Sequence, residues 1–204
     1  PLIGNFTLML DGVSGITALT ITLLSLAVSL YSIKYMEHEE NFDLYNVLYL
    51  LYYSGMVGTV LSINLVIFFL FFEFMLIPSF ILIGIWGTGQ KEKVALKYFL
   101  FTEAGALLML AGIGGAYMIT GSLDLFVIAE RTALLPKSTL YPIAVLILIG
   151  LFVKMAIFPL HNWLPDAHAE APTPISALLS PAMIGIGGYA AIRILFTSFP
   201  TVAL

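Results

Sequence analysis

The sequence predicts an all-α integral membrane protein, a bundle of about six transmembrane helices of which one is discontinuous. Three observations lead to this fold class. Hydrophobic residues make up 60% of the 204 residues and charged residues only 10%, whereas soluble domains carry about 25% charged residues. The mean hydropathy is +1.04. The apolar residues also fall into runs of the length that a helix needs to cross a bilayer, about 20 residues.

Six such runs divide the chain, with only short polar stretches between them. We therefore expect residues 1–204 to form a single transmembrane domain. Because the chain begins at Pro1 and not at a methionine, we also expect it to be a fragment of a longer subunit. The second and third runs meet at Ser62 with almost no loop and should form a tight antiparallel hairpin. The predicted helices are 8–34, 44–62, 64–86, 94–119, 140–168 and 173–197.

The fifth predicted helix is broken near Pro159. Proline lacks an N–H and its ring clashes with the carbonyl four residues earlier, so it stops or kinks a helix. A short half-helix over 160–168 would complete the crossing and place Lys154 near the middle of the bilayer. Broken helices at membrane depth line cavities and mark ion sites in transporters.

Aromatic and basic residues near the helix ends indicate how the bundle sits in the bilayer. The aromatic residues are typical of the interfacial belts that Trp and Tyr form. They are Tyr31, Tyr35, Tyr45, Tyr49, Trp86, Tyr98, Tyr141 and Trp163. The basic residues divide into Lys34, Lys91, Lys93 and Lys97 on one side and Arg131, Lys137 and Arg193 on the other. The slight excess favours the first side as cytoplasmic.

Composition excludes two classes of partner. The chain has no cysteine, which removes disulfides, thiolate metal sites and iron–sulfur clusters, so we expect no bound cofactor. The net charge is −4 and there is no basic run, so nucleic acid is not a partner. The lipid bilayer is the expected environment of the whole chain.

Two ionisable residues lie inside apolar helices. Glu73 is in the third predicted helix and Lys154 in the fifth. An uncompensated charge at the bilayer centre costs at least about 2.5–3.5 kcal/mol, so such residues usually serve an ion or proton pathway. Burial disfavours a charged amine, whereas a nearby carboxylate favours it. Lys154 would then take up and release a proton under the control of Glu73. The alternative is a static buried ion pair that fixes helix packing.

Glu103 lies about nine residues into the fourth predicted helix, roughly 13 Å from its start, which is too deep for easy snorkelling. It is a candidate relay point, or a side chain that bonds a neighbouring helix. Lys97 in the same helix is expected to extend to the headgroups. Asp11, at the start of the first helix, is expected to cap the N–H groups there.

Three further polar residues surround the predicted break: His161, Asp166 and His168. Histidine and carboxylate are usual zinc ligands, but the spacing of these residues fits no known metal motif. We therefore expect no metal site and assign the three residues to a water-connected relay or to helix capping.

Several stretches carry a family resemblance. Phe72–Pro78 (FEFMLIP), Val153–His168 (VKMAIFPLHNWLPDAH) and Ala171–Leu178 (APTPISAL) resemble the antiporter-like subunits of respiratory complex I. The same family includes subunits of Mrp-type cation/proton antiporters and of membrane-bound energy-converting hydrogenases. The second stretch is long and unusual, so the resemblance is specific. Residues 10–15 and 95–101 agree with it, and it covers nearly the whole chain.

The resemblance implies a larger antiporter-like fold of about fourteen helices, with two inverted repeats of about five helices each. This chain would cover helices three to eight. Glu73 matches the glutamate of the family on helix five, and Lys154 matches its lysine on the broken helix seven. The next titratable residue of the family, a lysine or histidine on helix eight, should lie near Ser180 or Gly185, where this chain has none.

The resemblance leaves three functions open. The preferred one is a proton- or cation-translocating subunit of an energy-converting redox complex, which carries no redox centre itself. The second is a subunit of a multi-subunit Na⁺/H⁺ antiporter, and the third is a structural scaffold that moves no ions. In each case we expect other membrane subunits as partners and a prokaryotic plasma membrane in preference to an organelle inner membrane. For the first two functions we expect protons to be the transported ions, with Na⁺ as a second candidate.

Overall fold

The computed structural model describes residues 6–203, and within that range every regular element is helical. The β-type pairings among these residues are two isolated bridges, Leu8 with Ser62 and Asn64 with Asp124. Six helices are long and apolar enough to cross a membrane. The all-α membrane fold expected from the sequence is therefore confirmed, whereas Pro1, on which the expectation of a fragment rests, lies outside the described residues.

The chain folds into α-helices joined by short connections. Their bounds are α1 Gly12–Tyr35, α2 Phe42–Leu61, α3 Leu65–Phe74, α4 Leu76–Trp86, α5 Lys91–Thr120, α6 Leu125–Thr132, α7 Lys137–Lys154, α8 Leu164–Glu170, α9 Thr173–Leu178, α10 Gly185–Ala191 and α11 Pro200–Ala203. Two π-helical segments, η1 at Leu179–Ile184 and η2 at Ile192–Phe196, continue α9 and α10, so residues 173–196 form one span.

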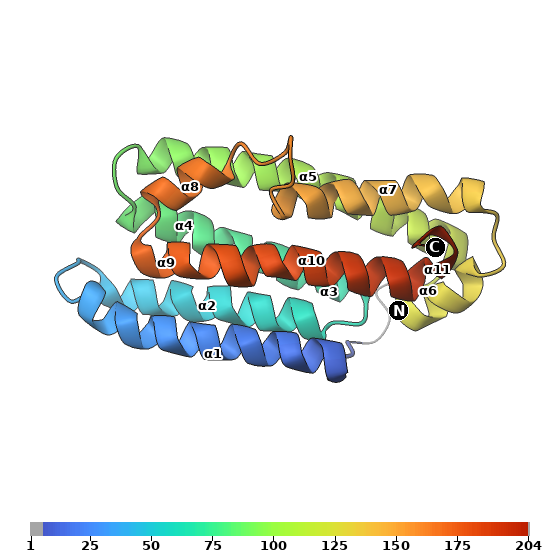
Figure 1. The fold of residues 1–204 in the computed structure, drawn as a ribbon, viewed down its shortest axis with the longest axis horizontal. Coiled ribbons are helices and arrows are strands. Elements are labelled where there is room, and N and C mark those ends of the chain that lie inside the picture. Colours follow the sequence, from blue (N-terminus) through green and yellow to red (C-terminus); the bar gives the residue numbers. More distant parts are fainter. Residues whose placement is uncertain (1–5, 204) are drawn as a thin grey trace.

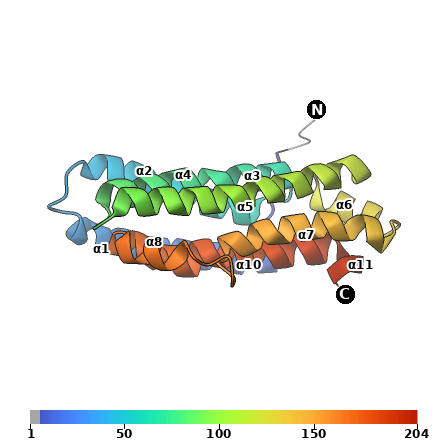
Figure 2. The ribbon, with the colours of Figure 1, turned by 90° about the horizontal axis from the view of Figure 1, so that it is seen from above.

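The long helices run nearly parallel to the long axis of the molecule and alternate in direction (Figure 1). Seen from above, they form two layers, with α2, α3, α4 and α5 in one and α1, α7, α8 and α10 in the other (Figure 2). The connections 36–41 and 87–90 lie at one end of the bundle, which we call the 36–41 end. The connections 62–64 and 121–136 lie at the opposite end.

The third span has an irregular turn at Met75, which its apolar pattern does not indicate, although Met75 keeps helical φ and ψ angles of −77° and −21°. Pro78 has no N–H for the Phe74 carbonyl, and its ring crowds that carbonyl. The helix ends at Phe74 and restarts at Leu76, and the Met75 N–H bonds to the Phe71 carbonyl at 3.1 Å. Glu73 therefore lies two residues before an irregular turn, inside a span that crosses as one helix of 22 residues.

The predicted interruption of the fifth span is present, but it begins before Pro159. α7 ends at Lys154, and Ala156 follows with φ +51°. The Ala156 and Ile157 N–H groups bond to the Val153 and Phe152 carbonyls at 3.1 and 3.0 Å. This is a Schellman motif, in which glycine is the usual left-handed residue. Alanine costs about 1–2 kcal/mol in that conformation.

The second half-helix of the fifth span begins later than expected, at residue 164 and not at about 160. The connecting segment 155–163 lies near the middle of the long axis, between the ends of α7 and α8 (Figure 1). The two helices therefore cross the bundle together, with the end of α7 near its centre.

Two features of the structure, a short helix and a π-helical turn, do not follow from the apolar pattern. α6 is a short helix in the stretch 120–139 that reads as polar, and Asp124 caps it by accepting from the Phe126 N–H at 2.9 Å. The last span contains Pro181 within η1, and a π-turn accommodates the N–H that proline lacks.

The expected interfacial belts are only partly present. Tyr31, Tyr35 and Tyr141 are exposed, as a belt requires. The other five belt residues are buried in the bundle, so the prediction is wrong for Tyr45, Tyr49, Trp86, Tyr98 and Trp163. Tyr45 and Tyr49 share one face of α2 because they are four residues apart, and that face turns to the core.

Candidate functional site

Glycines bring α5 and α7 into close contact at the centre of the bundle. A Cβ at Gly105 would lie 2.7 Å from Cβ of Val153, and one at Gly150 would lie 2.6 Å from the Gly105 carbonyl oxygen. Only a residue without a side chain permits this approach, which is common between membrane helices. The crossing brings Glu103, two residues before Gly105, next to Lys154, which follows Val153.

Lys154 is enclosed although it is charged when protonated. Its side chain is 1% exposed, and its Nζ has no hydrogen-bond partner among the described residues. The Nζ lies 4.9 Å from the centroid of the Phe72 ring, a contact that attracts a cation. Lys154 is also the last residue of α7, where the negative end of the helix dipole favours positive charge.

Two glutamates lie within electrostatic range of Lys154. Glu73 and Glu103 each interact electrostatically with the Lys154 amine, and the two carboxyl groups interact electrostatically with one another. Both glutamates are half-buried. Glu73 Oε1 is buried without a partner among the described residues. The three side chains form one interacting group, which we call the central triad: Glu73, Glu103 and Lys154.

The members of the central triad are not joined by a close ion pair. Within the described part of the chain, the N–O pairs within 4.0 Å are Lys34–Glu37, Lys97–Asp166 and Arg193–Asp11. Buried polar atoms normally have partners. Two buried polar atoms without a partner among the described residues, Lys154 Nζ and Glu73 Oε1, are thus unusual, and they make these side chains candidates for a functional role.

The polar residues around the break in the fifth span go to different partners. Asp166 bonds to Lys97 at 2.7 Å, so Lys97 does not simply extend to the headgroups as expected. His168 Nδ1 lies 2.7 Å from Ser176 Oγ. His161 Nδ1 is buried and has no partner among the described residues, which makes His161 the candidate relay residue nearest in sequence to the end of α7.

Trp163 fixes the break. Its side chain is fully buried, and its Nε1 donates to the Val153 carbonyl at 3.0 Å. Its ring also packs against Tyr98, with centroids 5.1 Å apart. The sequence analysis expected Trp163 at the membrane interface, whereas the structure buries it in the bundle. Its hydrogen bond holds the segment 155–163 against the last turn of α7, and this contact positions Lys154.

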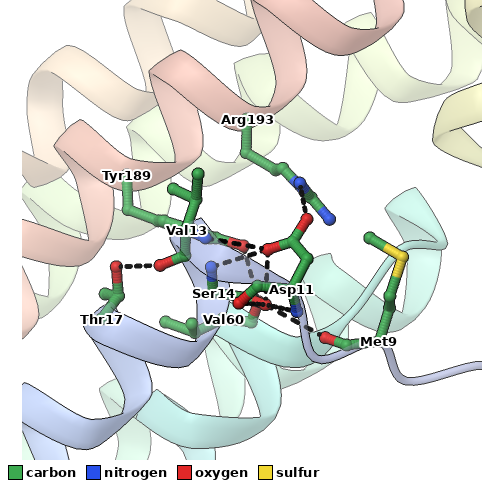
Figure 3. A network of polar contacts seen from close by, with 8 residues as sticks. All are labelled: Met9, Asp11, Val13, Ser14, Thr17, Val60, Tyr189 and Arg193. Carbon is green, nitrogen blue, oxygen red and sulfur yellow. Dashed lines mark hydrogen bonds and ion pairs between the residues drawn. The ribbon is translucent and has the colours of Figure 1, made fainter.

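A second charged contact joins the first and last spans, and sequence reasoning missed it. Asp11 caps α1 as expected, accepting from the Ser14 N–H at 2.8 Å. Its other oxygen lies 2.6 Å from Nη1 of Arg193 in η2 (Figure 3). Nearby, the Tyr189 hydroxyl donates to the Val60 carbonyl at 2.7 Å. An arginine in an apolar span is as unusual as Lys154, and that was the available signal.

The Asp11 contact predicts a dependence of stability on pH. The Ser14 backbone N–H, followed by the Ser14 hydroxyl and Arg193, lowers the pKa of Asp11 from 3.8 to about 2. Because the folded state lowers the pKa of Asp11, the ionised carboxylate adds to the free energy of unfolding above pH 3.8. This contribution disappears as the pH falls from 3.8 towards about 2.

We therefore expect Asp11→Asn to destabilise the detergent-solubilised protein by about 1 kcal/mol at pH 7, since the cap remains but the ion pair is lost. Thermal unfolding across pH 2–4 should show a smaller pH effect in this variant than in the wild type. Asp124→Asn, which changes a cap without an ion pair, is the control. Equal effects of the two substitutions would contradict the role of Arg193.

The fold and the central triad define a class, the polytopic helical membrane proteins with titratable side chains at the centre of the bundle. Comparison with known proteins then identifies the family. The profile described as "NADH:quinone oxidoreductase/Mrp antiporter, TM" matches residues 62–203, and the chain belongs to this family. A second profile, "NADH-Ubiquinone oxidoreductase (complex I), chain 5 N-terminus", matches residues 3–46. The resemblance seen in the sequence is confirmed.

Curated relatives match the larger part of the chain. NADH-quinone oxidoreductase subunit M of Rickettsia felis is 39% identical over 147 residues, which are 72% of this chain and 30% of the relative. NAD(P)H-quinone oxidoreductase chain 4 of Gloeobacter violaceus is 41% identical over 147 residues, 72% of this chain and 28% of the relative. The matched part of the chain thus spans less than a third of the length of these relatives.

Two solved structures share the fold. One is a structure of the membrane-bound sulfane sulfur reductase, an archaeal respiratory membrane complex, with a TM-score of 0.86 and 28% identity over 95% of this chain and 39% of the other. The second is a structure of the Mrp complex from Dietzia sp., with a TM-score of 0.86 and 26% identity over 98% of this chain and 37% of the other.

Proposed function

We propose that this chain is the proton- or cation-translocating part of a membrane subunit of an energy-converting redox complex, and that Glu73 and Lys154 control proton transfer in it. The observation that carries the proposal is the enclosed Lys154 amine, which has no close ion-pair partner within the described residues but lies in range of two carboxyl groups. A static ion pair would place N and O in direct contact.

The chemistry that the central triad supports is an internal proton exchange. When a carboxylate of Glu73 or Glu103 approaches Lys154, the ammonium form is favoured; when it withdraws, burial favours the neutral amine and the proton leaves. The break beside the triad, at 155–163, is a place where half-helices can shift. Glu103 supplies a third titratable group in a chain without a base at Ser180 or Gly185.

The relatives support a proposal for the kind of complex and the membrane in which this chain works. Relatives named as oxidoreductase subunits and the sulfane sulfur reductase structure favour a redox-driven complex. Accordingly, we propose other membrane subunits as partners and a prokaryotic plasma membrane as the location, since several relatives are bacterial. The redox centres would belong to those partner subunits.

A second candidate function is a subunit of a multi-subunit Na⁺/H⁺ antiporter, and the Mrp complex structure favours it. An antiporter would move protons against Na⁺ without an electron donor. A scaffold that moves no ions is the third candidate, and the absence of a base near Ser180 or Gly185 favours it.

The test uses the full-length subunit in its assembled complex, reconstituted in proteoliposomes. We expect Glu73→Gln to reduce proton translocation at least about a hundredfold, because proton transfer by a positioned group contributes that much or more. Glu130→Gln, the same change at an exposed position of α6, should leave translocation unchanged. Acidification driven by an electron donor would support the redox complex, and acidification driven by a Na⁺ gradient alone would support the antiporter. Full translocation by an assembled Glu73→Gln complex would contradict both.

A further inference from the structure

A row of buried tyrosines leads from the 36–41 end towards the central triad. Tyr45, Tyr49 and Tyr52 are spaced at i, i+4 and i+7 on α2, so they share one helix face. They are 0%, 4% and 0% exposed, and Tyr98 of α5 is 0% exposed. We call Tyr45, Tyr49, Tyr52 and Tyr98 the tyrosine row.

The inner end of the tyrosine row adjoins Glu73. The Tyr98 hydroxyl lies 2.8 Å from Ser79 Oγ, and Ser79 Oγ in turn donates to the Met75 carbonyl at 2.9 Å. Met75 is the irregular turn two residues after Glu73. Tyr98 is also within electrostatic range of Glu73 itself. The hydroxyl of Tyr98 is therefore linked through Ser79 to the turn next to the glutamate.

Tyr98 has a choice of partners. Its hydroxyl also reaches the Met183 Sδ in η1 at 3.2 Å. A hydroxyl has one proton to donate, so Tyr98 can donate either to Ser79 or to Met183. Switching between two acceptors is the reorientation that a hydroxyl needs after it has passed a proton on.

The middle of the row is Tyr52, whose hydroxyl is buried without a partner among the described residues. It lies within electrostatic range of Tyr49 on one side and Tyr98 on the other. A buried hydroxyl without a hydrogen bond destabilises the folded state, because it has lost the water that it would bond in solvent. Packing alone would favour phenylalanine at this position, because its ring has the same shape and no polar atom.

The outer end of the row reaches polar groups at the 36–41 end. Tyr49 donates to the Ser25 carbonyl at 2.6 Å, and the Tyr45 hydroxyl lies 3.0 Å from Ser32 Oγ. The Tyr45 ring packs edge-on against Trp86, with centroids 5.6 Å apart. Trp86 Nε1 bonds to the Glu40 carbonyl at 3.0 Å, which places this end of the row beside the exposed loop.

We propose that Tyr52 and Tyr98 are the inner hydroxyls of a proton uptake route that connects the 36–41 end with Glu73. This inference rests on the proposed function and deepens it, because it names the path by which the central triad is loaded. For a transfer, the Tyr49 hydroxyl turns from the Ser25 carbonyl towards the row, and the Tyr98 hydroxyl turns from Ser79 or Met183 towards Glu73. Each hydroxyl oxygen then accepts a proton from the outer neighbour while its own proton passes to the inner one. The tyrosines are unchanged at the end of the transfer, and the Glu73 carboxylate gains the proton.

The test is removal of the hydroxyls in the full-length subunit, assembled in its complex and reconstituted in proteoliposomes. Tyr52→Phe and Tyr98→Phe keep the rings and the packing. We expect each to lower the rate of proton translocation at least about tenfold and to change its solvent deuterium isotope effect. Tyr53→Phe is the matched control, because Tyr53 is the next residue of α2 and its hydroxyl bonds to Thr22 Oγ1 outside the row. It should translocate as the wild type does.

The outcomes separate this inference from the proposed function. If Tyr52→Phe and Tyr98→Phe translocate at the wild-type rate while Glu73→Gln does not, the tyrosine route is wrong and the function of the central triad stands. If Glu73→Gln also translocates normally, the proposed function fails and the route fails with it. A structural role of the hydroxyls would lower the thermal stability of the complex without changing the isotope effect, which would also overturn the route.

Discussion

Replacing Lys154 with alanine is expected to abolish proton translocation by the assembled complex, a loss of at least about a hundredfold. The substitution removes the one amine of the central triad and leaves Glu73 and Glu103 without their cationic neighbour. Because Lys154 fills a fully enclosed space, alanine also creates a cavity. Lys154→Met is the second variant, since methionine keeps most of the volume and has no titratable group.

Lys154→Arg decides between a proton carrier and a static charge. The guanidinium keeps the positive charge but does not lose its proton in proteins. A static ion pair that only fixes packing should tolerate arginine, so translocation would be retained. A carrier that must release its proton should not, and translocation should fall as far as it does in Lys154→Met.

The control is Lys137→Ala, at the exposed first residue of the same helix α7. Translocation is measured as dye-detected acidification of proteoliposomes, after gel filtration has shown that the complex is assembled. Normal pumping by an assembled Lys154→Met complex would rule out a transport role for this residue. Loss in Lys137→Ala would show that any change in α7 disturbs the complex.

The apolar pattern predicted the spans well because a bilayer demands about 20 apolar residues per helix, whatever the helix packs against. It did not predict where helices break. Pro78 and Pro159 are plain in the sequence, but each acts on residues several positions earlier. The irregular turn at Met75 and the break at Met155 depend on how the freed backbone groups find new partners, as the Val153 carbonyl does with Trp163.

The candidate site was predictable only residue by residue. Glu73, Glu103 and Lys154 stand out because charge is costly in an apolar helix. Their arrangement depends on the close α5–α7 approach at Gly105 and Gly150, which small residues allow but do not determine. The Asp11–Arg193 contact joins residues 182 positions apart, and Tyr45 and Tyr49 could be read as interfacial or as buried until the neighbours of α2 were known.

Gly150→Ala is expected to destabilise the bundle by about 1–3 kcal/mol, because an overpacked site forces neighbouring atoms apart. Its Cβ would lie 2.6 Å from the Gly105 carbonyl oxygen and 2.6 Å from the Met109 Cβ. A backbone oxygen cannot rotate away as a side chain can, so α7 must move relative to α5. That movement shifts Lys154 relative to Glu103.

The same substitution should therefore lower both the melting temperature of the solubilised protein and the rate of proton translocation. Gly114→Ala is the control on α5, because a Cβ there has no neighbour within 4 Å. It should be neutral or slightly stabilising, since alanine is the better helix former by about 1 kcal/mol. If Gly150→Ala melts and pumps as Gly114→Ala does, the close approach of α5 and α7 does not set the geometry of the central triad. If it melts lower but pumps normally, the crossing serves stability alone and Lys154 is positioned by the Trp163 contact.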